Sequence, residues 1–202
     1  MRRGCASADP RLERWLDALL RTPGLTGIRD RGEARRVHVT ESLAGAELVR
    51  SFGGPVVDVG SGGGAPGLPL AAALPELEVT LLEANGRKCA FLELAAHDFP
   101  NVRVLNGRAE EQGVDGYAVA VAKALAPPVV AVEWCLPLVR PDGAAILWVG
   151  PSAEPGRVAR VAEQLGGRLQ PSPAGFLVLR KCGPTPAGFP RRPGVARKRP
   201  LA

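Results

Sequence analysis

A run of glycines follows a short apolar segment and has the composition of a loop that holds a nucleotide-like cofactor. The apolar segment Val56–Val59 contains one carboxylate, Asp58, and leads into Gly60–Gly62. Glycine tolerates positive φ angles and has no Cβ to keep a ligand away from the backbone. A second apolar segment, Glu78–Glu83, ends in an acid about 20 residues later, a spacing that suits a carboxylate accepting ribose hydroxyls. The two segments therefore predict a site for an adenosine-bearing cofactor.

Two prolines and the strand carboxylate help to separate the cofactor classes that use such a loop. The sequence satisfies the GxGxxA form of the dinucleotide fingerprint, which needs a helix that starts in the loop and binds pyrophosphate through free N–H groups. Pro66 and Pro69 remove two of those donors. Asp58 would repel a pyrophosphate but suits a cationic ligand. We therefore favour S-adenosylmethionine over a nicotinamide cofactor; a glycine-rich turn without a ligand is the remaining alternative.

The rest of the chain supplies the elements that would position this loop. Helical periodicity fills the region before the first strand, beginning with the cap and N1 pair Asp9-Pro10. Strand-like and helical segments then alternate, and the expected strands cover residues 56–59, 78–83, 101–105, 117–122, 144–149 and 175–180. Because no helical pattern follows the last strand, we expect it to join the sheet antiparallel. The prediction is an α/β fold of the Rossmann-like class I S-adenosylmethionine-dependent methyltransferases: a helical cap, then a mostly parallel seven-stranded sheet with an antiparallel last strand.

The charge distribution indicates an anionic partner. The net charge is +6, and the chain from Gln164 onward holds eight basic residues and no acid. Such an asymmetry is typical of nucleic-acid binding. We divide the chain into a helical cap at 1–53, a methyltransferase domain at 54–182 and a basic tail at 183–202. The tail is either a solvated, extended end or a phosphate-binding arm whose candidate RNA-binding residues are Arg191, Arg192, Arg197, Lys198 and Arg199.

Cysteine spacing and apolar tracts exclude several other classes of protein. The four cysteines, Cys5, Cys89, Cys135 and Cys182, form no CxxC pair, so we expect reduced thiols in a cytoplasmic protein and no metal site. The longest apolar tract, Tyr117–Val139, contains charges and prolines. It predicts a strand and a helix rather than a membrane span. We expect the protein to be a monomer.

Several motifs together resemble one family, the bacterial small-subunit rRNA guanine-N7 methyltransferases known as RsmG or GidB. The resemblance covers nearly the whole chain, and its matching pieces lie at Gly24–Asp30, His38–Leu43, Asp58–Leu70, Val79–Glu83, Gly107–Glu111 and Pro190–Leu201. The prolines on either side of Gly67, together with the Gly-Arg-Ala-Glu-Glu turn, are more specific than the glycine fingerprint alone.

The resemblance implies methyl transfer from S-adenosylmethionine to N7 of a guanosine in 16S rRNA, with 16S rRNA or the small ribosomal subunit as partner. The candidate cofactor-binding residues are Asp58, Gly60, Ser61, Gly62, Gly67, Leu68, Glu83, Arg108, Ala109, Glu110 and Lys123. Lys123, His38 and Ser42 are the candidate residues on the substrate side. Without the resemblance, the sequence around His38 would favour a structural or solvent-facing histidine. Guanine N7 carries a free lone pair, so we assign no general base.

The sequence departs from the family's pattern at positions on the substrate side. Lys123 stands where the family usually has arginine, Glu41 where it has aspartate, and Trp148-Val149 where it has Leu-Lys. Lysine lacks the bidentate geometry of arginine. These changes leave open a methyltransferase for another RNA or a small molecule, and the basic tail leaves open an RNA-binding relative without turnover. A nicotinamide oxidoreductase is a more distant alternative.

Overall fold

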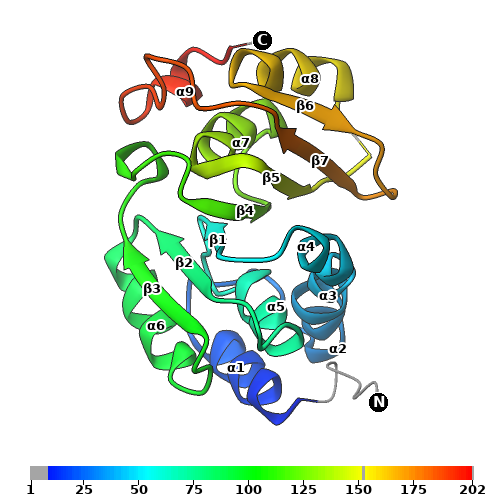
Figure 1. Ribbon diagram of the computed structural model, residues 1–202. Coiled ribbons are helices and arrows are strands. Elements are labelled where there is room, and N and C mark those ends of the chain that lie inside the picture. The colour runs from blue at the N-terminus through cyan, green and yellow to red at the C-terminus, as the bar shows by residue number, and fades with distance from the viewer. Residues whose placement is uncertain (1–8, 152, 202) are drawn as a thin grey trace.

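The computed structural model describes residues 9–151 and 153–201, which form helices on both faces of one twisted sheet (Figure 1). Seven strands of the described chain lie in the order β3-β2-β1-β4-β5-β7-β6. The strands are β1 (Val56–Val59), β2 (Val79–Glu83), β3 (Val102–Asn106), β4 (Tyr117–Lys123), β5 (Val139–Trp148), β6 (Gly167–Gln170) and β7 (Phe176–Lys181). Strands β1 to β5 pair in parallel, whereas β7 runs antiparallel to β5 and β6. The predicted methyltransferase sheet with its reversed last strand is confirmed.

The helices of the described chain cover the two faces of the sheet. They are α1 (Pro10–Arg21), α2 (Arg31–Ala34), α3 (Glu41–Leu43), α4 (Ala46–Phe52), α5 (Gly67–Ala73), α6 (Gly86–Ala96), α7 (Pro128–Cys135), α8 (Pro155–Gln164) and α9 (Val195–Lys198). A π-helical segment, Arg35–Thr40, joins α2 to α3. Two 3-10 turns lie at Ala109–Glu111 and Leu136–Leu138.

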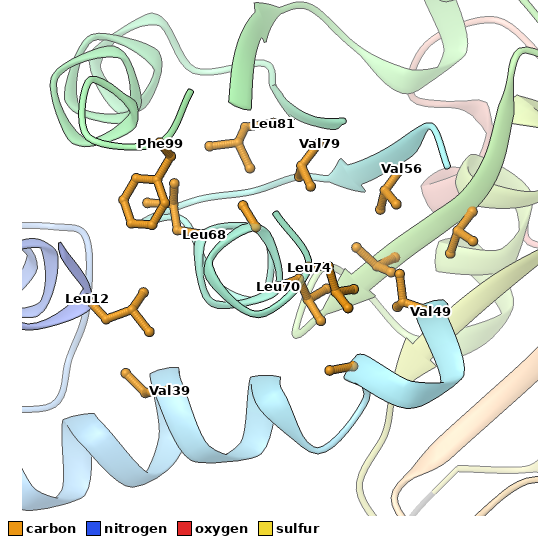
Figure 2. Packing of buried hydrophobic residues seen from close by; sticks show 14 of the residues in the cluster. Leu12, Val39, Val49, Val56, Leu68, Leu70, Leu74, Val79, Leu81 and Phe99 are labelled. Atoms are coloured by element: carbon orange, nitrogen blue, oxygen red, sulfur yellow. The ribbon is translucent and has the colours of Figure 1, made fainter. Parts of the chain in front are cut away.

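Strand residues alternate between the two faces and so build two separate cores. Val56 of β1 belongs to the core formed with α1 and α4 to α6, whereas the next residue, Val57, belongs to the core formed with α7 and α8. Figure 2 shows the first of these cores, in which Leu12 of α1 and Val39 of the π-helical segment lie near α5. Because these side chains are fully buried, the helices before β1 complete the main core. The division of the chain into three parts remains a prediction.

Two details of the sequence prediction were wrong. Strand β6 was not among the expected strands, because it has only four residues and two of them, Arg168 and Gln170, are polar. The turn expected at residues 140–143 lies within β5, where Asp142 has a φ of 69°. Of the two alternatives left open for the C-terminal tail, the solvated, extended end does not fit, because the tail contains α9 and Ala196 on that helix is only 2% exposed.

The cysteines of the described chain differ in exposure. Cys89 and Cys135 are buried, whereas Cys182 directly after β7 is exposed; Cys5 lies outside the described residues. Within the same residues, no helix has both the length and the apolar character needed to cross a membrane.

Candidate active site

The glycine loop leaves the carboxyl end of β1 in a conformation that requires glycine. Gly60 has a φ of 69° and Gly62 a φ of 57°, values that side chains with a Cβ rarely adopt. A Cβ at Gly60 would also collide with the side chain of Leu125. At Gly62 the nearest contact of an added Cβ would be the Gly60 carbonyl oxygen, 3.8 Å away. Gly60 and Gly62 therefore expose backbone atoms that no side chain of their own covers.

Asp58 lies beneath this loop and fixes its far end. Its side chain is buried, and Oδ2 accepts a hydrogen bond from the Gly67 N–H at 3.0 Å. The Ser61 hydroxyl donates to the Asp58 carbonyl oxygen at 2.8 Å. Burial raises the pKa of Asp58 to about 7. Its Oδ1 is buried without a hydrogen-bond partner in the described part of the chain, which leaves an acceptor that suits a cationic group or a bridging water.

Glu83, at the end of β2, connects the loop to the second strand. One carboxylate oxygen accepts from the Gly62 N–H at 2.9 Å and the other from the Asn85 N–H at 2.8 Å. An ionised carboxylate offers about four acceptor sites, so these two bonds leave others for a ligand. Glu83 is 8% exposed and lines a pocket. The chemistry of this donor set fits the ribose of an adenosine-bearing cofactor.

A pocket of about 500 Å³ lies at the carboxyl edge of the sheet, where ligands bind in open α/β folds. Among the predicted cofactor and substrate-side residues, nine line it, namely Gly60, Ser61, Gly62, Glu83, Arg108, Ala109, Glu110, Lys123 and His38. The remaining cofactor candidates, Asp58, Gly67 and Leu68, are buried beneath the loop. These three residues support the loop and do not line the pocket.

Lys123 joins the end of β4 to the helical cap. Its Nζ donates to the Val37 carbonyl oxygen at 2.6 Å and lies 3.4 Å from Oε2 of Glu41. Burial lowers the pKa of Lys123, and the Glu41 carboxylate opposes that shift. The next residue, Ala124, has a φ of 54°, which is uncommon for a residue with a Cβ. Two departures from the family's pattern, Glu41 and Lys123, thus meet in one ion pair.

The two other substrate-side candidates lie in different environments. His38 lines the pocket, and its Nε2 is 3.0 Å from Oγ1 of Thr26. Burial lowers the pKa of His38, and the charge of Lys123 adds to that effect. Ser42 is fully buried, and its hydroxyl donates to the His38 carbonyl oxygen at 2.8 Å. Ser42 therefore supports the segment that carries His38, and its own hydroxyl is already engaged.

Trp148 joins β5 to the cap in a way that the sequence did not predict. Its Nε1 donates to the Glu41 carbonyl oxygen at 2.8 Å, and its ring meets Phe176 edge to face at 5.2 Å between centroids. A Cβ at Gly45 would collide with the Trp148 ring. Trp148 is thus an anchor between the sheet and the helices that precede it.

The basic residues of the C-terminal tail divide into two groups. Arg191 forms two hydrogen bonds to the buried carboxylate of Glu133, both at 2.5 Å. The guanidinium of Arg197 lies 5.3 Å from the ring centroid of Trp134, and Arg197 lines the pocket. Arg197 is nevertheless exposed, as are Arg192, Lys198 and Arg199. The last three form the second group, because their side chains make no hydrogen bond, ion pair or ring contact within the described part of the chain.

Several residues of the pocket wall were not predicted. They include Leu25, Val37, Lys88, Leu125 and Trp134. Leu125 had a usable signal, because it lies two residues after the carboxyl end of β4. Trp134 had none, since an aromatic residue in an apolar helix is indistinguishable from an ordinary core residue in the sequence.

Comparisons with known proteins agree with this geometry. Residues 10–160 match the family described as GidB, rRNA small subunit methyltransferase G. A protein of Synechococcus elongatus named ribosomal RNA small subunit methyltransferase G is 37% identical over 198 residues, 88% of this chain and 82% of its own. The proteins of the same name from Chloroflexus aggregans and Moorella thermoacetica are 36% and 38% identical. They cover 94% and 88% of this chain, which in turn spans 88% and 82% of their lengths.

Solved structures share the fold at low sequence identity. A T. thermophilus 16S rRNA methyltransferase in complex with AdoMet and guanosine has a TM-score of 0.58 at 18% identity, covering 85% of this chain and 47% of its own. A TehB-like SAM-dependent methyltransferase from Corynebacterium glutamicum has a TM-score of 0.52 at 21% identity, covering 71% of this chain and 88% of its own. Both likenesses concern the fold, which is that of the class I methyltransferases.

Proposed function

The chain belongs to the rRNA small subunit methyltransferase G family, and we propose that it methylates N7 of a guanosine in 16S rRNA of the small ribosomal subunit. It is an S-adenosylmethionine-dependent methyltransferase. The observation that carries the proposal is the continuous pocket wall formed by Gly60–Gly62, Glu83 and Arg108–Glu110, with Lys123 and His38 also on it. A cofactor site and a substrate-side surface thus share one cavity.

The residues of the glycine loop and the next two strand ends would hold the cofactor. Gly60 and Gly62 allow close approach to the backbone, and Glu83 has free acceptor sites for ribose hydroxyls. Ala109 and Glu110 are the candidates for the adenine side. When bound, S-adenosylmethionine supplies an electrophilic methyl group on a sulfonium centre.

On the substrate side the protein needs to orient a base rather than deprotonate it. Guanine N7 has a free lone pair, and placing it in line with a reacting centre accounts for a large part of a rate enhancement. Lys123 offers three N–H donors, of which one is held by Val37 and a second is directed at Glu41. We assign the third donor, together with the His38 ring, to the substrate base or phosphate.

The exposed basic side chains of Arg192, Lys198 and Arg199 would bind rRNA phosphates. Deleting the tail would test this poorly, because Ala196 is buried and its removal would disturb packing. Replacing the three exposed residues by alanine should instead weaken RNA binding and make its salt dependence shallower, by about 0.7 in the logarithmic slope for each phosphate that the variant no longer binds. An unchanged slope would exclude these residues from the RNA interface.

The direct test is methyl transfer from labelled S-adenosylmethionine to small subunits from cells that lack the modification. We expect label at N7 of one guanosine in 16S rRNA. No transfer to naked rRNA or to intact subunits, while S-adenosylhomocysteine still binds, would refute the substrate and leave the cofactor assignment standing. We also propose that the protein works in the cytoplasm, where ribosomal subunits are found, and as a monomer; light scattering of the purified chain would test the latter.

A further inference from the structure

The C-terminal arm, Pro190–Arg199, is fastened to the methyltransferase core by charged groups. The guanidinium of Arg191 holds both carboxylate oxygens of Glu133 and also donates to the Arg199 carbonyl oxygen at 2.9 Å. Glu133 is only 2% exposed. A buried carboxylate is costly without its partner, so this pair fixes the arm against α7 (Figure 1).

A second contact brings the arm to the cofactor pocket itself. The N–H of Gly194 donates to Oε1 of Glu110 at 3.2 Å. Glu110 lies in the turn that is the candidate for the adenine side, and both Gly194 and Glu110 line the pocket. In the described chain, no hydrogen bond involves Oε2 of Glu110. One carboxylate is thus shared between the arm and the pocket.

The third contact places a planar cation on the pocket wall. Arg197 lies over the Trp134 ring, and both residues line the pocket. The indole N–H of Trp134 is buried and has no hydrogen-bond partner among the described residues, so packing and the cation hold this ring in place. Arginine stacks on aromatic faces through its flat guanidinium. A guanidinium held at this position suits an adenine ring.

We propose that the C-terminal arm forms the adenine end of the cofactor pocket and that Arg197 contacts the adenine-bearing part of the bound cofactor. The inference rests on the cofactor assignment above. It gives Arg197, which is also exposed, a role separate from the RNA binding proposed above for Arg192, Lys198 and Arg199. Because the arm and the cofactor then stabilise each other, binding of one favours docking of the other.

Calorimetric titration of the full chain with S-adenosylhomocysteine, without RNA, tests the contact. Arg197→Ala should weaken binding about two- to fivefold, which matches a cation–π contact made by an exposed cation. Arg197→Lys should recover only part of the affinity, because lysine is not planar. The control is Arg168→Ala, which removes the same charge from an exposed position on β6 and should leave the affinity unchanged.

Limited trypsin digestion supplies an independent readout, because the arm contains several arginines and Lys198. Saturating S-adenosylhomocysteine should slow cleavage within the arm at least severalfold in the unmodified chain but much less in Arg197→Ala. Equal affinity in Arg197→Ala and the unmodified chain, with no protection of the arm by ligand, would overturn the inference alone. Failure of the unmodified chain to bind S-adenosylhomocysteine would overturn the cofactor assignment and the inference together.

Discussion

Replacing Glu83 by glutamine tests whether its carboxylate holds both the glycine loop and the cofactor. The carboxylate accepts from the Gly62 and Asn85 N–H groups, whereas an amide has only one acceptor oxygen. One of these two N–H groups must then face an NH₂ group. A hydrogen bond to a charged group contributes about 1.5–3 kcal/mol. The free energy of unfolding should therefore fall by about that much.

The same change should weaken cofactor binding. A displaced loop and a weaker acceptor for the ribose hydroxyls together should cost about 1.5–3 kcal/mol, or about a 10- to 150-fold rise in the Kd for S-adenosylhomocysteine. Calorimetry gives the Kd, and urea unfolding gives the stability. The control is Glu93→Gln, an exposed position on α6. If Glu83→Gln bound the ligand within about twofold of the unmodified chain, a difference far below one charged hydrogen bond, Glu83 would not be a ribose ligand.

Three further substitutions test other parts of the site. Because folding raises the pKa of Asp58 from 3.8 to about 7, the native state keeps a proton that the unfolded chain releases; the free energy of unfolding should therefore fall as pH rises through this range. Asp58→Asn should flatten that slope in urea titrations, and an unaltered slope would contradict the burial argument. Lys123→Ala frees the cap from β4 and should lower kcat/KM for methyl transfer about 100-fold, with Lys123→Arg as the conservative comparison. Trp148→Phe removes the hydrogen bond to the Glu41 carbonyl oxygen and the part of the ring that packs on Gly45, and should cost about 1–3 kcal/mol of stability; no change would mean that Trp148 does not anchor the cap.

The parts of the fold that the sequence predicted are those governed by local pattern. Apolar runs, glycine positions and the acid at Glu83 placed the first two strands and the loop, because each signal lies within a few residues of the feature that it specifies. Strand β6 lacked such a signal, because it has only four residues and Leu169 is its one large apolar side chain, which is too short a pattern to separate it from a loop.

The candidate site was predictable at its strand ends and unpredictable where distant segments meet. Arg191 and Glu133 are separated by 58 residues, so the sequence around either residue does not predict their ion pair. A basic, proline-rich tail has the composition of an extended chain, yet contacts with Glu133, Glu110 and Trp134 hold this one against the domain. Ser42 was chosen by resemblance alone, and the structure shows its hydroxyl bonded to the backbone of its own helical segment.

The exposure of Cys182 makes the start of the tail accessible to thiol chemistry. The thiol lies directly after β7, at the point where the chain leaves the sheet toward the arm, while Cys89 and Cys135 are buried. In a Cys5→Ser background, a maleimide dye should attach at Cys182 in the folded protein. A fluorophore at that position would report on the tail's local environment in real time, while leaving every residue of the pocket wall in its native form.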